Sequence, residues 1–195
     1  MIVKRLLITG FEPFGGEMTN PSWDALVNIP CTVGEYELIK LNIPVVFGRS
    51  AEIVIAKAEE MQVDAILCIG QAGGRDAVTP EMIGINLRHA SIPDNDGNEP
   101  IDERIDKDGA AAYFTTFSAR KISEAINSIG ICSRVSYSAG AYVCNDVIYS
   151  LLRHFDGCDV KIGFIHVPYS ADQNKEPSMP LEMIQRAIIK SIEVL

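Results

Sequence analysis

Two side chains in the C-terminal third of the chain have the chemistry of a nucleophile and its base. Cys144 follows a small, glycine-containing turn at 138–140 and precedes an apolar run with helical spacing. A thiol at the start of a helix lies near the positive end of the helix dipole, and that field favours the thiolate. His166 lies in a second apolar segment, 160–167, and an imidazole can remove the thiol proton and later protonate a leaving amine. This pair indicates a cysteine hydrolase.

Both residues also have a purely structural interpretation. Cys144, Val147, Ile148 and Leu151 follow an i, i+3, i+4, i+7 pattern, so the thiol could belong to the buried face of a helix. Its position at the helix start favours the catalytic interpretation, because unpaired backbone N–H groups there can bind an oxyanion. His166 could be a buried histidine with hydrogen-bond partners. The other cysteines are interpreted as structural: Cys31, Cys68, Cys132 and Cys158.

An acidic group should orient the imidazole, as in other catalytic triads. Four carboxylates lie near the ends of predicted strands: Glu12, Asp76, Glu81 and Asp94. Glu81 follows Thr79-Pro80 and could equally begin a helical turn. Local spacing does not choose among the four.

Two glycine-rich segments follow predicted strands. The segment 10–16 is not G-x-G-x-x-G and has no Gly-Lys-[Ser/Thr], and its glutamate would repel phosphate. Its aromatic residues, Phe11 and Phe14, favour an apolar pocket, with packing onto the core as the alternative. The free backbone groups of 70–75 could hydrogen-bond a small polar ligand or form a tight turn.

Hydrophobic patterning predicts alternating strands and helices. Strands are expected over 2–9, 36–46, 64–69, 82–87, 133–137 and 160–167. Helices are expected over 22–27, 50–61 with Ser50 as N-cap, 118–129, 144–154 and 181–194. Residues 91–110 form a long loop of the kind often found at active sites. This order predicts an α/β fold, a three-layer α/β/α sandwich with a mostly parallel, twisted central sheet and ligand sites at the carboxyl ends of its strands.

Bulk properties limit the possible functions. A chain of 195 residues fits one domain, so a single catalytic domain over 1–195 is expected. The net charge is −9 and no Lys/Arg cluster is present, which argues against a nucleic-acid partner. The apolar stretches are too short for a membrane span, and the N-terminal run lacks signal-peptide features, so a cytoplasmic protein is expected. Five cysteines without C-x-x-C argue against a disulfide framework, and the three histidines lack metal-ligand spacing.

Six ordered segments, spread over most of the chain, resemble the pyroglutamyl peptidase I family, also called pyrrolidone-carboxylate peptidases. One such motif is weak evidence, whereas six in family order are strong. The matching segments are 10–16 with Asn20-Pro21-Ser22, Gly70-Gln71-Ala72-Gly73-Gly74-Arg75, Thr79-Pro80-Glu81, Ile92-Pro93-Asp94-Asn95, 138–140 with Val143-Cys144-Asn145, and Gly163-Phe164-Ile165-His166-Val167-Pro168-Tyr169.

The resemblance implies a cysteine exopeptidase that removes N-terminal pyroglutamate from peptides through a thioester acyl-enzyme. It implies Cys144 as the nucleophile, His166 as general base and acid, and Glu81 as the residue that orients the imidazole. The family needs no metal or other cofactor, has a phosphorylase-like α/β/α fold, and commonly forms homotetramers. The expected partners are therefore pyroglutamyl peptides and further copies of this chain.

The resemblance also implies a substrate pocket. The Gln71 backbone would bind the lactam, and a slot that does so should discriminate against proline, which lacks the ring carbonyl. The resemblance places Asn20 among the expected substrate-binding residues. The apolar walls around the pyrrolidone ring would be Phe11, Phe14, Ile92, Tyr142 and Val143.

The chain departs from the family pattern at two places. The family usually has Asp-Ala-Arg where this chain has His89-Ala90-Ser91, so its active-site arginine is replaced by Ser91. Arg75 or Arg88 could supply the charge instead. The usual Tyr-Ile-Pro-Glu-Gln is altered at 169–173, which would affect an access loop. The alternatives are a catalytically impaired paralogue that binds pyroglutamyl peptides and, from the fold alone, a nucleoside-phosphorylase-like enzyme.

Overall fold

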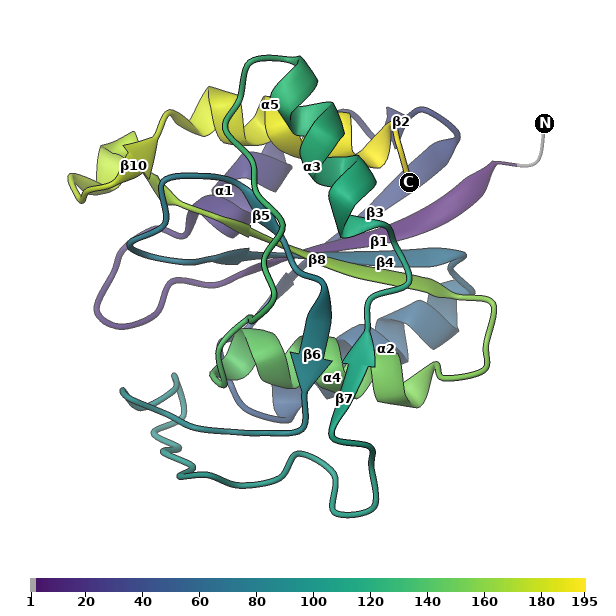
Figure 1. Cartoon of the computed structure of the whole chain (residues 1–195), viewed down its shortest axis with the longest axis vertical. Helices are drawn as coiled ribbons and strands as arrows, with labels where there is room; N and C mark the ends of the chain where they lie inside the picture. Colours follow the sequence, from purple (N-terminus) through teal and green to yellow (C-terminus); the bar gives the residue numbers. More distant parts are fainter. Residues whose placement is uncertain (1–2) are drawn as a thin grey trace.

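A six-stranded sheet forms the centre of the protein, whose computed structural model describes residues 3–195. The strand order is β2-β3-β1-β4-β8-β5 (Figure 1). The inner strands are parallel, whereas β2 and β5 run antiparallel at the two edges. The mostly parallel sheet predicted from the sequence is therefore confirmed. The strands are β1 (Lys4–Phe11), β2 (Thr32–Val33), β3 (Tyr36–Ile43), β4 (Ala65–Gln71), β5 (Thr79–Pro80) and β8 (Lys161–Val167).

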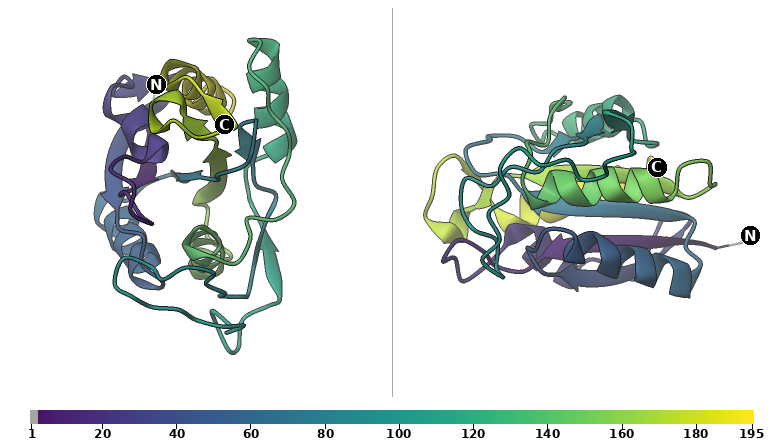
Figure 2. Two further views of the ribbon diagram at one scale, coloured as in Figure 1. Left: turned by 90° about the vertical axis from the view of Figure 1, so that its left-hand side faces the viewer. Right: turned by 90° about the horizontal axis from the view of Figure 1, so that it is seen from below.

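Helices cover both faces of the sheet (Figure 1, Figure 2). Strand side chains alternate between the faces, so Leu6 and Ile8 pack towards one helical layer and Leu7 towards the other. This arrangement confirms the α/β/α sandwich. One layer contains α1 (Pro21–Val27), α3 (Ala119–Ser128) and α5 (Leu181–Ile192), and the other contains α2 (Arg49–Met61) and α4 (Val143–His154).

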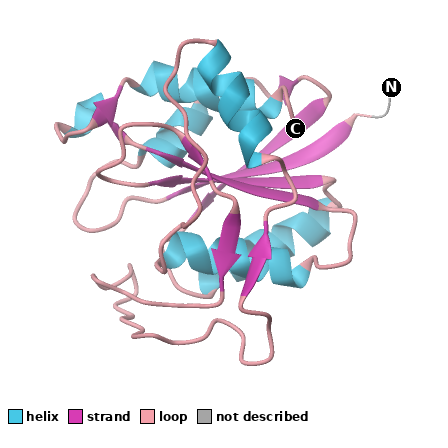
Figure 3. Ribbon diagram, viewed as in Figure 1, coloured by secondary structure: helices cyan, strands magenta, loops and turns pink. Residues whose placement is uncertain are grey.

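Two small strand pairs lie outside the central sheet (Figure 3). β6 (Ile83–Ile85) pairs with β7 (Ala112–Phe114), and both pack against α4. β9 (Tyr169–Ser170) pairs with β10 (Ser178–Met179), with the short 3-10 helix η1 (Ala171–Gln173) between them. The described residues between β6 and β7 form no helix or strand, which confirms the long loop at 91–110.

The strand predicted over 133–137 does not form. This segment makes only isolated bridges to the chain at Val78 and Glu81. Val78 donates to the Cys132 carbonyl at 3.0 Å and Met82 donates to the Ser136 carbonyl at 2.8 Å. Pro80 lies between these two donors and has no N–H, so the ladder is interrupted where the segment needs a continuous one.

Ser50 is not the N-cap of α2, contrary to the sequence-based expectation. The cap is Gly48, whose φ of 72° suits glycine. The Ser50 hydroxyl instead accepts from Val46 N–H at 3.1 Å and lies 2.7 Å from the Pro44 carbonyl. Ser50 therefore ties the end of the preceding loop to the helix.

The other predicted helices and strands are present, with ends shifted by a few residues. The strand predicted over 2–9 corresponds to β1, although residue 2 lies outside the described residues. Among residues 3–195, no helix combines the length and apolar character needed to cross a bilayer.

Candidate active site

A crevice opens where β1 and β4 separate. Their pairing ends at Thr9 and Cys68, after which β1 continues beside β3 and β4 continues beside β8 as far as Gln71. The strand order reverses direction at this point. In open α/β sheets, ligands bind outside the carboxyl ends of the strands at such a switch point.

A small cavity of about 30 Å³ lies at this crevice. It brings together Cys144 and most of the predicted substrate-binding side chains, although they come from three separate parts of the chain, 11–20, 71 and 142–144. Val45 also lines it and was missed from the sequence, since a lone valine after a strand carries no functional signal. The lining residues are Phe11, Phe14, Asn20, Val45, Gln71, Tyr142 and Cys144.

Two predicted wall residues do not line this cavity. Val143 is fully buried in the core on the α4 side of the sheet. Ile92 is 42% exposed, and its Cδ1 lies 3.6 Å from the position that a Cβ on Gly15 would take. Ile92 is therefore placed beside the 10–16 loop rather than within the cavity.

Cys144 is the second residue of α4 and lies against β4 at Gly70. A Cβ on Gly70 would stand 2.9 Å from the Cys144 Sγ and 2.8 Å from the Phe164 ring. Such a distance is too short for a real Cβ, so only glycine leaves room for the thiol. Gly70 pairs in register with His166 of β8, which places the imidazole on the neighbouring strand at the same level.

His166 and Glu81 form a buried pair. The His166 Nδ1 lies 2.7 Å from the Glu81 Oε1, and the residues are 3% and 1% exposed. The antiparallel pairing of Thr79 with His166 carries Glu81 to this position, and Glu81 N–H donates to the Phe164 carbonyl at 2.9 Å. Of the four carboxylates that the sequence left as candidates to orient the imidazole, Glu81 is therefore the one that contacts His166.

The thiol and the imidazole face the same side of the sheet. Phe164 and His166 are two residues apart in β8 and therefore point to the same face of the sheet. Phe164 belongs to the core cluster that packs on α4. Their ring centroids are 4.8 Å apart. Within residues 3–195 no hydrogen bond joins the Cys144 thiol to His166. Catalytic hydrogen bonds are often long before substrate binds.

The environment fixes the protonation of the buried pair. Burial opposes ionisation of Glu81, but the hydrogen bond and charge of His166, with Ser136 and Arg75, outweigh it and lower the pKa of Glu81. Burial lowers the pKa of His166, against the raising effect of Glu81 and with the help of Arg75. An ionised Glu81 accepts a hydrogen bond, so His166 Nδ1 carries the proton and Nε2 is left as the base.

The surroundings of the Cys144 thiol favour its protonated form. Burial raises the pKa of Cys144 to about 12, the charges of Glu81 and Cys68 act in the same direction, and Arg75 opposes them. The residue as a whole is partly exposed, but its sulfur is surrounded by protein groups, and these set the direction of the pKa shift. Burial of the sulfur therefore opposes the thiolate that the helix start is expected to favour.

Of the two arginines considered in place of Ser91, only Arg75 contacts the triad. Its Nη1 lies 2.7 Å from the Glu81 Oε1. Arg88 instead bonds Asp146 of α4 at 2.5 Å. Ser91 itself is exposed in the long loop.

Hydrogen bonds fix two of the predicted substrate-binding side chains, those of Asn20 and Gln71. Asn20 caps α1 through its Oδ1, which accepts from Ser22 N–H at 3.1 Å, and its Nδ2 donates to the Glu12 carbonyl at 2.9 Å. Gln173 of η1 donates to the Gln71 Oε1 at 3.0 Å. Gln173 was not singled out from the sequence, because the contact joins segments a hundred residues apart.

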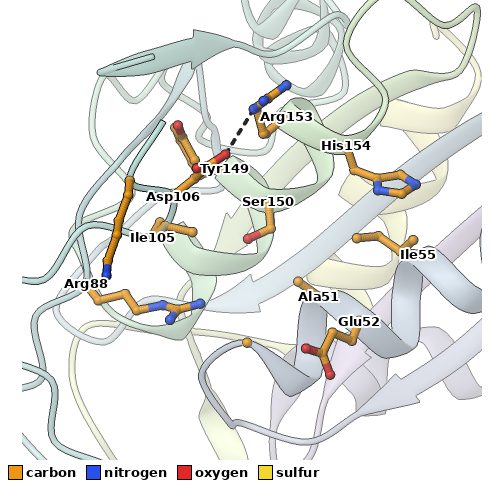
Figure 4. A pocket seen from close by; sticks show the side chains of 12 residues that line it. Ala51, Glu52, Ile55, Arg88, Ile105, Asp106, Tyr149, Ser150, Arg153 and His154 are labelled. Atoms are coloured by element: carbon orange, nitrogen blue, oxygen red, sulfur yellow. Dashed lines mark hydrogen bonds and ion pairs between the residues drawn. The ribbon is translucent and has the colours of Figure 1, made fainter. Parts of the chain in front are cut away.

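A much larger cavity of about 690 Å³ lies elsewhere, between α2, α4 and the 105–107 segment (Figure 4). Among its lining side chains, Arg153 pairs with Asp106 at 3.1 Å and Arg88 pairs with the buried Asp146. It contains none of the predicted site residues. Within residues 3–195, no group of three His, Cys, Asp or Glu side chains is arranged to hold a metal ion.

Known proteins resemble this chain over nearly its whole length. The family model described as pyroglutamyl peptidase matches residues 4–195. The pyrrolidone-carboxylate peptidase of Staphylococcus saprophyticus is 44% identical over 98% of this chain and 92% of that protein. The corresponding protein of Thermoanaerobacter sp. is 45% identical over 98% of this chain and 97% of that protein.

Solved structures of the same kind share the fold. The crystal structure of pyroglutamyl peptidase I from Bacillus amyloliquefaciens matches with a TM-score of 0.94 and 40% identity, over 99% of this chain and 95% of that one. The pyrrolidone carboxyl peptidase from Thermococcus litoralis matches with a TM-score of 0.93 and 37% identity, over 98% and 92%. The crevice with its thiol, imidazole and buried carboxylate, together with likeness along the whole chain, shows that this protein belongs to the pyroglutamyl peptidase family of cysteine peptidases.

Proposed function

We propose that this protein hydrolyses the peptide bond after an N-terminal pyroglutamyl residue, with Cys144 as nucleophile, His166 as base and acid, and Glu81 as the orienting carboxylate. The observation that carries the proposal is the buried 2.7 Å contact between His166 and Glu81, one strand away from a thiol in an apolar cavity. A buried imidazole with one nitrogen committed to a carboxylate presents the other nitrogen as a base.

In the first half-reaction, the thiol proton moves to His166 Nε2 as the sulfur attacks the scissile carbonyl carbon. Because burial raises the pKa of Cys144 and lowers that of His166, both groups enter the reaction neutral and the proton transfer accompanies attack. The start of α4 has no side-chain cap, so its first backbone N–H groups remain available for the oxyanion. The C–N bond then breaks, and His166 gives its proton to the departing amine.

In the second half-reaction, water hydrolyses the thioester. His166 Nε2 takes a proton from the water, the oxygen attacks the thioester carbonyl, and the C–S bond breaks. The proton returns to the sulfur, and free pyroglutamate leaves. Glu81 remains ionised throughout, because it stabilises the transient imidazolium.

The cavity walls suit a neutral lactam ring. Phe11, Phe14 and Tyr142 supply apolar surface, and the rings of Phe14 and Tyr142 lie 6.2 Å apart between centroids. Because β4 has lost its β1 neighbour beyond Cys68, backbone groups near Gln71 are available to bind the ring carbonyl and N–H. Asn20 shapes the wall through its cap on α1, and Ile92 and Val143 support the pocket from outside the cavity.

We also propose that the chain is a single catalytic domain that assembles with further copies of itself into a tetramer. Both core clusters share one central sheet, which supports the first point. The family resemblance supports the second, and Phe114 and Tyr137 expose 69% and 66% of their surface. Light scattering coupled to size exclusion tests the assembly, and a monomeric mass contradicts it.

The proposed activity is tested with a fluorogenic pyroglutamyl amide and its prolyl counterpart. The purified protein should cleave the first, spare the second, and lose activity after iodoacetamide treatment or Cys144→Ser. Folded protein that does not cleave the pyroglutamyl amide contradicts the proposed function. Cleavage that survives Cys144→Ser contradicts the assigned nucleophile.

A further inference from the structure

The guanidinium of Arg75 joins three segments of the candidate site. Its Nη1 donates to the Glu81 Oε1 at 2.7 Å and to the Thr79 Oγ1 at 2.6 Å, while its Nη2 donates to the Ser138 carbonyl at 3.1 Å. Ser138 begins the turn that leads into α4 and Cys144. One side chain therefore links the carboxylate to the segment that carries the nucleophile.

We propose that Arg75 is a positioning residue that holds Glu81 and the turn at 138–140 in the arrangement needed for catalysis, and that shares the Glu81 charge so that His166 rests as the neutral base. The proposal rests on the proposed function and adds a residue to it. Arg75 touches neither Cys144 nor His166 by a hydrogen bond within residues 3–195, so its effect passes through Glu81 and the turn.

The bonding of Glu81 shows why a second cation matters. His166 and Arg75 both bind Oε1, while Oε2 is buried and has no hydrogen-bond partner in the described part of the chain. The nearby Ser136 hydroxyl donates to the Ser138 carbonyl at 3.1 Å. Without Arg75, the buried carboxylate would have His166 as its one cationic partner, which favours the imidazolium and removes the base.

The geometry needs an arginine rather than any cation. Glu81 and Ser138 accept from different nitrogens of one planar fork, and a lysine ammonium has no such fork. The charged groups that face His166 are Glu81 and Arg75, and both act on its pKa. The thiol of Cys144 responds to the same two residues.

The test compares wild type with Arg75→Met and Arg75→Lys, using Arg153→Met as the matched control. Like Arg75, Arg153 pairs with a carboxylate, that of Asp106, but it lines the large cavity. For Arg75→Met we expect kcat for a pyroglutamyl amide to fall about 10- to 100-fold with little change in KM, as for a lost positioning contact. The acid limb of kcat/KM should move to higher pH, because a positive charge that lowers the pKa of His166 is gone.

Two further readouts separate this role from simple structural support. Arg75→Lys keeps the charge but not the fork, so kcat should fall while the acid limb stays near that of wild type. Millimolar guanidinium should restore part of the activity of Arg75→Met and leave Arg153→Met unchanged. An unshifted acid limb in folded Arg75→Met, or no response to guanidinium, overturns the proposal.

The same variants distinguish this proposal from the proposed function. If wild type cleaves no pyroglutamyl amide, the proposed function fails, and the pH dependence of Cys144 alkylation by iodoacetamide then reports on Arg75. Because Arg75 lowers the pKa of Cys144, Arg75→Met should be alkylated more slowly than wild type at the same pH. Equal alkylation rates count against the proposal.

Discussion

The two cavities of this protein differ in size and in what their polar groups do. The large one, about 690 Å³, is bordered by the partly exposed ion pair of Arg153 and Asp106, whose side chains are 45% and 33% exposed. The small one, about 30 Å³, lies beside the hydrogen-bonded pair of His166 and Glu81, whose side chains alone are 4% and 0% exposed. The comparison shows that volume does not locate the chemistry here.

The energetic difference between the cavities follows from burial. Exposed ion pairs are worth about 0–1 kcal/mol because water screens them. Buried charges are retained only where partners hold them, so they strongly affect the pKa of nearby groups. The small cavity therefore lies beside buried groups whose protonation can serve catalysis.

The largest effect is expected at the nucleophile. Cys144→Ala should lower kcat/KM for a pyroglutamyl amide by at least about 10³-fold, because no other side chain can form the acyl-enzyme. Steady-state kinetics beside an unchanged thermal unfolding curve checks this. Comparable activity in the variant would remove the distinction between the two cavities.

The next effect is expected from Gly70→Ala. The new Cβ would meet the Cys144 Sγ at 2.9 Å and the Phe164 ring at 2.8 Å, so the thiol must move. Displacing a reacting atom by about 1 Å can cost about 10²-fold in rate. Kinetics and a crystal structure of the variant test this, with Ser150→Ala in the large cavity as the control. Full activity would show that the thiol can act from another position.

The pH profile should distinguish a neutral thiol–imidazole pair from a resting ion pair. Because burial lowers the pKa of His166 below its usual 6.5, the acid limb of kcat/KM should lie below pH 6.5, with loss of about tenfold per pH unit beyond it. Alkylation of Cys144 should keep rising with pH, since the pKa of the thiol is raised to about 12. An alkylation rate that stops rising near neutral pH would contradict the neutral thiol and imidazole of Cys144 and His166.

A smaller effect is expected at Gln173. Its Oε1 accepts from Ser170 N–H at 3.0 Å and its Nε2 donates to Gln71. Losing the second bond should raise KM about fivefold, the equivalent of about 1 kcal/mol. Gln173→Met loses both bonds, whereas Gln173→Glu loses only the donor to Gln71. An effect in the Met variant alone would assign the role to the bond with Ser170.

The smallest effect is expected in the large cavity. Arg153→Met breaks an exposed pair with Asp106, so activity should stay within about twofold of wild type and stability should change by less than about 1 kcal/mol. Kinetics and urea unfolding measure both. A large loss of activity would mean that this cavity also serves the reaction.

Many of the candidate site residues could be predicted from the sequence, but the contacts between segments that are far apart in the chain could not. The helix start at Cys144 and the strand end at His166 are local signals, and patterning also predicts the sheet and its helical layers. The role of Glu81 could be predicted only from the family resemblance. The residue reaches His166 through the antiparallel pairing of β5 with β8, which joins segments far apart in the sequence. The predicted strand at 133–137 failed because Pro80, on the other segment, lacks the donor it needed.

Other contacts depend on geometry that no local pattern contains. Gly70 has the appearance of an ordinary strand-ending glycine until the Sγ of a helix seventy residues later packs on it. Arg75 lies in a glycine-rich segment, yet its partners come from two other segments. The helix start that favours a thiolate is a local feature, whereas the burial of the sulfur that opposes it depends on the whole fold.

The central claim is that Cys144, beside the buried His166–Glu81 pair, forms an acyl-enzyme with the pyroglutamyl group. The direct measurement is mass spectrometry of the protein quenched in acid during turnover of a pyroglutamyl amide. We expect a mass increase of one pyroglutamyl acyl group on the peptide that contains Cys144, and no such increase with the prolyl amide. Turnover without this adduct, or the adduct on another cysteine, would contradict it.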